Sequence, residues 1–266
     1  VIKDIKQYYN MEWNHTYSVP YIRNVKPKNL KQENKNKDTL KNGYYTFKKE
    51  NRENIESIDW NRTTIQPKNI QFVHNPIGRK NQDPWCLKKI LKLASNSNDS
   101  IFLQSPYVIP SRHMKSEFDK YDINLNNVSI LTNSLASSPN IPAVSGYLHK
   151  RNNIIKSGAR IYEYQGPQSI HSKTYVFDNH ISVIGSFNLD ARSSFLSTES
   201  MVVITSEKFA KIVHKNIQND LDNSLQLDKN YRYIKSKKVT EGSVSRFKKR
   251  ITQIMGKLVL PFDFLL

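Results

Sequence analysis

Short β-rich runs alternate with segments of helical period from residue 70 to residue 164 of the sequence. Branched and aromatic residues mark the runs as strands, whereas apolar residues spaced three or four apart mark helices. The expected strands are 70–74, 101–104, 128–131 and 161–164, and the expected helices are 84–94, 111–121 and one that ends at 155. Elements in this order build a sheet that is covered by helices on both faces. We therefore expect an α/β fold, a three-layer α/β/α sandwich with a mixed, largely parallel sheet.

A β-hairpin is expected next, within the stretch 170–199. Residues 174–177 and 181–184 are rich in branched and aromatic side chains, as strands are. Asp178 and Asn179 lie between them and are typical turn residues. The pattern therefore predicts two short strands joined by a tight turn.

Four polar side chains flank this hairpin in pairs that are two residues apart. Residues two apart in an extended chain share a face, so His171 should lie beside Lys173, and Ser186 beside Asn188. An imidazole, an ammonium, a hydroxyl and an amide would then converge on one site. These groups suit phosphoryl transfer, because the cation and the amide can hold phosphate oxygens while the imidazole transfers a proton or attacks phosphorus.

Together with Asp178 and Gly185, the four residues form the pattern H-x-K-x4-D-x6-G-S-x-N. This pattern resembles the HKD motif of the phospholipase D superfamily, and every signature position matches. The resemblance implies the three-layer fold expected above and a reaction through a covalent phosphohistidine.

Further segments resemble the bacterial cardiolipin synthase branch of that superfamily and are most like its cardiolipin synthase C type. Residues 188–193 read N-L-D-x-R-S, residues 104–110 read Q-S-P-Y-x-I-P, and residues 131–136 read L-T-N-S-L-A. Ser197 stands where the branch has the Asn of an N-T-E segment, which is a departure from the pattern. The resemblance covers roughly residues 1–205 and the apolar C-terminus.

The resemblance also implies roles for the motif residues. His171 would be the general acid and base, while Lys173, Ser186 and Asn188 would hold the phosphate oxygens. Asp178 belongs to the catalytic motif, with the part of orienting and supporting the hairpin, and Gly185 supports the site. Glu199 would orient a histidine and thereby raise the basicity of its imidazole. Neither the chemistry nor any cluster of side chains calls for a metal or a cofactor.

The sequence contains one complete motif, although members of the superfamily build each active site from two. His113, Met114 and Lys115 form a second H-x-K, but the residue five after Lys115 is Lys120, and no G-S-x-N follows. We interpret that segment as a polar surface helix. Because the chain begins at Val1, the simplest expectation is the C-terminal half of a longer enzyme, with the missing half supplied in cis. The alternative is a homodimer in which a second copy completes the site.

The charge of the chain favours polyanionic partners. Its 266 residues include 41 Lys and Arg against 23 Asp and Glu, which gives a net charge of +18. The resemblance places a membrane surface with anionic phospholipid, phosphatidylglycerol above all, ahead of nucleic acid. No apolar run reaches the length of about eighteen residues that a membrane span needs. The resemblance implies a peripheral location on the cytoplasmic side of a bacterial inner membrane.

We expect four parts along the chain. Residues 1–22 would end the preceding half, and residues 23–66 would be a polar, basic linker of loop or irregular helix. Residues 67–227 would be the phospholipase D-like domain with the second HKD motif, and residues 228–266 a basic and apolar C-terminal extension. Such an extension suits docking on an anionic bilayer or, equally, a helix that returns to the core.

Three functions remain open at this point. The first is a phosphatidyltransferase that makes cardiolipin from phosphatidylglycerol and a second phospholipid, with phospholipid hydrolysis as a close variant. The second is a homodimeric HKD endonuclease or phosphodiesterase, which the single motif and the positive charge favour. The third is a catalytically inactive half that binds membranes.

Overall fold

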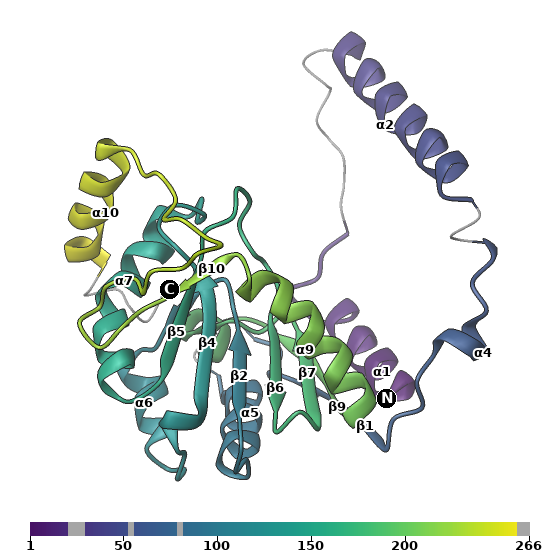
Figure 1. The fold of residues 1–266 in the computed structure, drawn as a ribbon. Helices are drawn as coiled ribbons and strands as arrows, with labels where there is room; N and C mark the ends of the chain where they lie inside the picture. The colour runs from purple at the N-terminus through teal and green to yellow at the C-terminus, as the bar shows by residue number, and fades with distance from the viewer. Residues whose placement is uncertain (21–29, 53–55, 79–81, 260–266) are drawn as a thin grey trace. The chain divides into compact units, whose positions relative to one another are not determined.

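The computed structural model describes residues 1–20, 30–52, 56–78 and 82–259 and divides the chain into two compact units. The larger unit comprises Val1–Ile5 and Pro67–Leu266, and the smaller unit comprises Lys6–Gln66. The motif and all the expected strands lie in the larger unit (Figure 1).

The described residues of the N-terminal part include the helices α1 (Ile2–Trp13), α2 (Leu30–Glu50) and α4 (Trp60–Thr63). The regular helix α2 corrects our expectation of loop or irregular helix for the basic linker. Its lysine, leucine, glutamine and glutamate residues are strong helix formers, and it contains no proline to interrupt them. All residues of α2 are described and none of them is buried, so local helix propensity explains this helix better than packing does.

The larger unit is built on an eight-stranded sheet with the order β1-β9-β7-β6-β2-β4-β5-β10. Its strands, in that order, are Asn69–His74, Ser200–Thr205, Ile181–Gly185, Thr174–Phe177, Ile101–Gln104, Val128–Asn133, Arg160–Tyr164 and Ser224–Gln226. A separate pair, β3 (Val108–Ile109) and β8 (Leu189–Asp190), joins the loop after β2 to the segment after the G-S of the motif.

The sheet is mixed, as expected, but the expectation of a largely parallel sheet is wrong. Of its seven strand pairings, only β2 with β4 and β4 with β5 are parallel. The other five are antiparallel, because the hairpin β6-β7 and strands β1, β9 and β10 extend the sheet on both sides of the parallel core.

Helices cover both faces of the sheet, which confirms the sandwich of three layers. One hydrophobic core lies under α5 (Trp85–Ser95), α6 (Arg112–Phe118), α7 (Ile141–Lys156) and α8 (Ala191–Phe195). The other core lies under α9 (Glu207–Leu221) on the opposite face, as the view in Figure 1 shows. The hairpin supplies both cores, because Tyr175 and Phe177 belong to the first and Val176 to the second.

The turn of the hairpin also matches its sequence. Asp178 and Asn179 both have a positive φ, of 49° and 47°, which these two residue types tolerate better than most. The amide of His180 donates to the carbonyl of Phe177 over 3.0 Å and closes the turn.

The C-terminal extension belongs to the larger unit. Its helix α10 (Arg246–Val259) packs against α7. Residues 260–266, which include most of the apolar piece expected at the C-terminus, lie outside the described part of the chain, as do Tyr21, Lys26 and Lys28 of the N-terminal segments.

Candidate active site

The segment that carries the histidine of the motif is fixed by one asparagine before β6 begins. The side chain of Asn133, at the end of β4, donates from Nδ2 to the carbonyl of Ile170 over 3.0 Å. Its Oδ1 accepts from the amide of the same residue over 2.9 Å. This two-point bond sets the position of the residue directly before His171.

His171 and Lys173 lie together, as their spacing predicts. Nζ of Lys173 lies 3.0 Å from Nδ1 of His171 and donates to the carbonyl oxygen of His171 over 2.9 Å. Lys173 is 8% exposed, whereas the His171 side chain is open to solvent. The imidazole is therefore accessible to a substrate, while the buried ammonium of Lys173 holds it in place through Nδ1 and the backbone carbonyl.

Burial lowers the pKa of Lys173 below the ordinary lysine value, and the negative charges of Glu199 and Asp190 act in the opposite direction. These two carboxylates are thus near enough to influence the ammonium. Both come from the chain just after the G-S of the motif, so the two ends of the motif meet in space.

Gly185 lies where two backbones approach closely. It ends β7 opposite Met201 of β9, and its amide donates to the carbonyl of Lys173 over 3.3 Å. A Cβ at this position would lie 2.3 Å from the carbonyl oxygen of Ser200 and 2.6 Å from Cα of Met201. Glycine is therefore required here by the spacing between β7 and β9.

Replacing Gly185 by alanine is expected to destabilise the domain by roughly 2 to 3 kcal/mol, because the new methyl meets main-chain atoms that cannot rotate away. Urea-induced unfolding followed by circular dichroism measures the change. Gly78→Ala is the matched control, because its Cβ would meet only the flexible Gln82 side chain, at 3.4 Å, and the expected change is within about 1 kcal/mol. Equal stabilities of the two variants would contradict this reading of Gly185.

Ser186 is held by β9 on one side and by a carboxylate on the other. Its amide donates to the carbonyl of Ser200 over 2.9 Å, and its Oγ donates to the carboxylate of Glu199. The amide of Ser200 donates back to Ser186 Oγ over 3.1 Å. The hydroxyl is exposed, so it is both fixed and accessible.

Asn188 is connected to the same carboxylate through a second serine. Nδ2 of Asn188 donates to Oγ of Ser193 over 3.3 Å, and this hydroxyl donates to Glu199 over 3.1 Å. The amide of Ser193 in turn donates to the buried carboxylate of Asp190 over 2.7 Å at the start of α8. Burial raises the pKa of Asp190, whereas these bonds from Ser193 lower it.

The structure therefore brings together four of the expected catalytic residues where β6 begins and β7 ends. These residues are His171, Lys173, Ser186 and Asn188. Asp178 does not join them. It lies in the turn at the other end of β6, where its carboxylate accepts from the amides of Asn98, Asp99 and Ser100 over 2.9–3.0 Å. This position agrees with the part of orienting and supporting the hairpin that we expected for Asp178, and it joins the hairpin to the loop before β2.

Glu199 also differs from the expectation that it orients a histidine. The hydrogen bonds of its side chain run to the hydroxyls of Ser186 and Ser193. It therefore organises the serine and asparagine side of the site rather than the imidazole of this chain.

Several supporting residues were not singled out from the sequence. Asn75, which is fully buried, donates to the carbonyls of Ser193 and Ser197 and accepts from the amide of Cys86. Its own amide donates to the carbonyl of Glu199 over 2.8 Å. In the sequence, Asn75 stands directly before Pro76, and an Asn-Pro pair is typical of a loop.

Tyr175 fixes the backbone between Ser186 and Asn188. Its hydroxyl donates to the carbonyl of Phe187 over 2.5 Å, and both side chains are buried. The alternation of the strand predicts an inward Tyr175, but not the partner of its hydroxyl.

The segment 113–115 is a surface helix, as expected. His113 and Lys115 are exposed on α6, and Lys115 pairs with Asp119 over 3.0 Å. Its H-x-K therefore contributes no group to the site.

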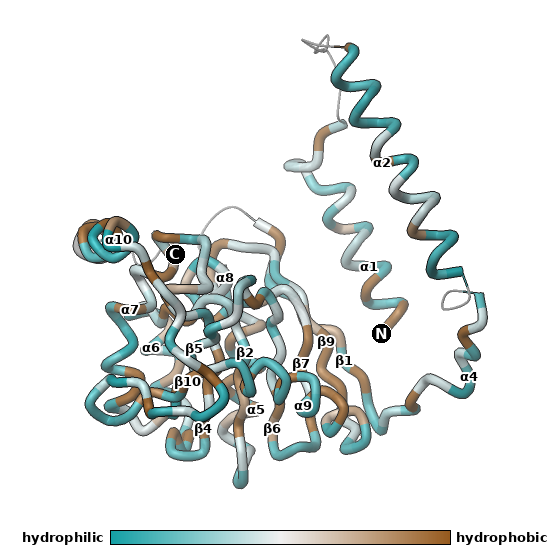
Figure 2. Tube along the Cα trace, turned by 45° about the horizontal axis from the view of Figure 1, so that its top comes forward, coloured by the Kyte–Doolittle hydropathy of each residue, from teal (hydrophilic) through white to brown (hydrophobic). Residues whose placement is uncertain are grey.

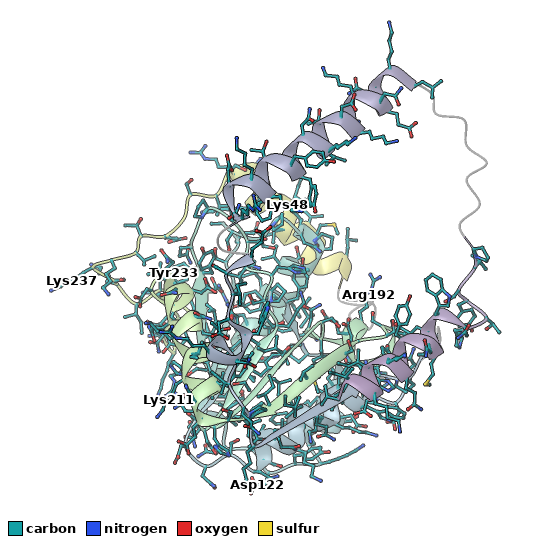
Figure 3. All side chains as sticks on the ribbon, turned by 90° about the vertical axis from the view of Figure 1, so that its right-hand side faces the viewer. Lys48, Asp122, Arg192, Lys211, Tyr233 and Lys237 are labelled. Carbon is teal, nitrogen blue, oxygen red and sulfur yellow. The ribbon has the colours of Figure 1, made fainter. Side chains whose placement is uncertain are left out.

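The described residues contain no group of three or more His, Cys, Asp or Glu side chains that could hold a metal ion. In the same part of the chain, no helix is long and apolar enough to cross a membrane. Basic side chains are spread over the surface, and Figure 3 shows Arg192 on α8, Lys211 on α9 and Lys237 in the C-terminal extension.

Comparison with known proteins gives a consistent result. Residues 90–221 match the family model described as "Cardiolipin synthase, PLD-like domain". An uncharacterised protein of Helicobacter pylori is 33% identical over 149 residues, which cover 51% of this chain and 30% of that protein. Cardiolipin synthase C of Escherichia coli is 28% identical over 168 residues, which cover 56% of this chain and 36% of that protein. The matched segments thus span about a third of the length of these relatives.

Among solved structures, the phosphatidylserine synthase of Haemophilus influenzae superposes with a TM-score of 0.54 at 14% identity. The match covers 76% of this chain and 49% of the other. At this level of identity the likeness concerns the fold alone.

Proposed function

Because residues 90–221 of this chain form a domain of the phospholipase D superfamily, we propose that the chain supplies one half of the active site of a phosphatidyltransferase. The enzyme would make cardiolipin from phosphatidylglycerol and a second phospholipid. The observation that carries the proposal is the solvent-open imidazole of His171 with the buried ammonium of Lys173 behind it.

In the first step, a histidine of the other half attacks the phosphorus of phosphatidylglycerol. A bond from nitrogen to phosphorus forms, and the bond from phosphorus to the glycerol oxygen breaks. His171 donates its ring proton to that oxygen, so glycerol leaves as a neutral alcohol.

In the second step, a hydroxyl of the second phospholipid attacks the phosphohistidine. His171, which is now unprotonated, accepts the proton of that hydroxyl. The nitrogen–phosphorus bond breaks and cardiolipin forms, so both histidines return to their starting states. Water in place of the second phospholipid gives hydrolysis by the same route.

The other polar groups suit the charge that develops on the phosphate oxygens. The Lys173 ammonium can donate to these oxygens without first moving far, because it is already held by the chain. The hydroxyl of Ser186 can donate to them when its single proton turns away from the carboxylate of Glu199. Asn188 contributes an amide just after the end of β7, and its link to Ser193 and Glu199 fixes its orientation. The proposed reaction uses no cofactor and no metal.

A two-part site follows from the single motif. The missing part would come from another segment of a longer polypeptide or from a second copy of the chain. The second arrangement favours the alternative of a homodimeric phosphodiesterase that acts on nucleic acid, and the charge of +18 is compatible with it.

The test combines mass and turnover. We would express the chain alone and within any longer reading frame that contains it, determine the mass of each product by light scattering, and incubate each with vesicles that contain labelled phosphatidylglycerol. Labelled cardiolipin together with released glycerol is the expected product of the competent form.

Each other result has a definite meaning. Phosphatidic acid alone would replace the transferase by a hydrolase. An active dimer that cleaves DNA without added metal and leaves the lipid unchanged would favour the nuclease. Folded protein of either length with no turnover of the lipid would overturn the proposal and leave a membrane-binding half. The corresponding location is peripheral, on the cytoplasmic side of a bacterial inner membrane.

A further inference from the structure

The helix α10 presents three different sides. One side packs against α7, a second carries exposed apolar residues, and a third carries exposed cations. Figure 2 shows hydrophobic and hydrophilic positions together on its turns. An ordinary surface helix has only a buried and a polar side, so the exposed apolar side needs an explanation.

The first side anchors the helix to the domain. Thr252 is only 4% exposed, and Gly256 lies close to α7, where a Cβ would stand 3.9 Å from the carbonyl oxygen of Ser145. Nζ of Lys248 donates to the carbonyl of Ser138 over 2.8 Å. These contacts hold α10 firmly against the domain, so the exposure of its other sides is not explained by a loose attachment of the helix.

The second side consists of Phe247, Ile254 and Leu258, which are 73%, 60% and 60% exposed. Their spacing of seven and then four residues places them in one line along a helix of 3.6 residues per turn. We call these three residues the apolar ridge.

The third side borders this ridge with positive charge. Arg246, Lys249 and Arg250 are all exposed in the first turns of α10, and none of the residues from Arg246 to Gly256 is acidic. A protein surface that joins an apolar ridge to a row of cations matches the boundary between the headgroups and the acyl chains of an anionic bilayer. Nucleic acid would be attracted by the cations alone and would leave the ridge unused.

The anchor also relates the helix to the active site. Lys248 binds the loop at residues 136–138, which directly follows Asn133, the residue that holds the backbone before His171. The amide of Gly242, just ahead of α10, donates to Gln165 in the loop after β5, over 3.0 Å. The C-terminal extension thus binds the loop after β4 and the loop after β5. The first loop follows Asn133, and the second leads along the chain to His171.

We propose that α10 is the element that docks this domain on an anionic lipid bilayer, with the apolar ridge inserted among the lipids and the basic side on the headgroups. This inference rests on the proposed function for the purpose of docking only. In that function the substrate is a phospholipid, so a domain docked on the bilayer would have the phosphodiester of the lipid close to its active site. The docking itself depends on the ridge and the cations, and it can be measured without turnover.

The test uses the full chain and vesicles of phosphatidylcholine and phosphatidylglycerol in equal parts, with pure phosphatidylcholine as the neutral comparison. Ile254→Asp is expected to weaken co-sedimentation with the anionic vesicles by at least about tenfold, because it puts a charge into the ridge. Ile212→Asp on α9 is the matched control, since Ile212 is 46% exposed beside lysines on another helix of the same unit. Binding of this variant should be unchanged.

A second measurement covers the case in which the aspartate disturbs α10. Cys86 is the single cysteine and is fully buried, so a cysteine placed at Ile254 can be labelled selectively with a polarity-sensitive dye. Its emission should shift to the blue on anionic vesicles, whereas the same dye on a cysteine at Ile212 should not shift.

Three results would overturn the proposal. They are equal binding of both aspartate variants, equal binding to neutral vesicles, and an unshifted dye at position 254 on bound chain. Failure of lipid turnover with these shifts intact would reject the proposed function and leave the docking in place. Retention on duplex DNA that requires Arg250, without vesicle binding, would assign the helix to nucleic acid instead.

Discussion

In the proposed reaction, replacing His171 by asparagine is expected to lower the turnover of phosphatidylglycerol by about a thousandfold. Asparagine keeps a polar side chain of similar reach but has no group that can release and recover a proton near neutral pH. The reaction would then have to expel glycerol as an alkoxide. Initial rates of release of labelled glycerol measure the effect.

His180→Asn is the matched control for this prediction. His180 belongs to the same hairpin but lies in the turn at the far end, where it is partly exposed and 3.8 Å from a carboxylate oxygen of Glu207. Its replacement should leave the rate within about twofold, because this turn follows β6, whereas His171 and Lys173 precede it. A His171 variant that is folded and as active as the His180 variant would remove the imidazole from the mechanism.

The sequence predicts the local structure around this site well, because the signals there act over a few residues. The alternation of 174–177 places Tyr175 and Phe177 on one face, and the Asp-Asn pair provides the turn. The hairpin and the approach of His171 to Lys173 both follow from these short-range rules.

The directions of the strands could not be predicted in the same way. Strands β1 and β9 pair antiparallel although more than a hundred residues separate them along the chain. The alternation of strands and helices suggested a largely parallel sheet, but within the main sheet only β2, β4 and β5 are paired in parallel. Pairing across such distances is decided by how the whole sheet buries its faces, which no short window of sequence contains.

The same limit applies to the residues that support the site. Asn133 was part of a recognised segment, yet its two hydrogen bonds to Ile170 join positions 37 apart in the sequence. Asn75 reaches Ser193 across an even longer separation. The motif thus identifies the groups that we propose to react, whereas the asparagines that hold them can be recognised only in the folded chain.

A buried carboxylate outside the site shows a further long-range connection. Glu163 on β5 is 1% exposed and accepts from the Tyr147 hydroxyl over 2.8 Å and from Arg151 over 3.0 Å. The hydroxyl of Tyr233, in the C-terminal extension, donates to its other oxygen. Burial raises the pKa of both tyrosines, so their hydroxyls stay protonated and remain donors. One carboxylate therefore joins β5, α7 and the segment that leads to α10.

Replacing Glu163 by alanine is expected to destabilise the domain by about 3 to 5 kcal/mol, because the guanidinium of Arg151 and two hydroxyls lose their acceptor in a buried place. Tyr233→Phe removes a single donor and should cost about 1 to 2 kcal/mol. Both changes are measured by urea unfolding, and limited proteolysis between residues 234 and 245 should speed up in the two variants as the extension detaches.

Glu207→Ala is the control for this last prediction. Its side chain is 69% exposed on α9, so the expected change is below about 0.5 kcal/mol, and the extension should stay protected from proteolysis. If Glu163→Ala unfolded at the same urea concentration as this control, the buried cluster would contribute nothing to stability. In that case the extension would be held by the contact of α10 with α7 and by the bonds of Lys248 and Gly242, and proteolysis of the Tyr233 variant would match that of the unmodified chain.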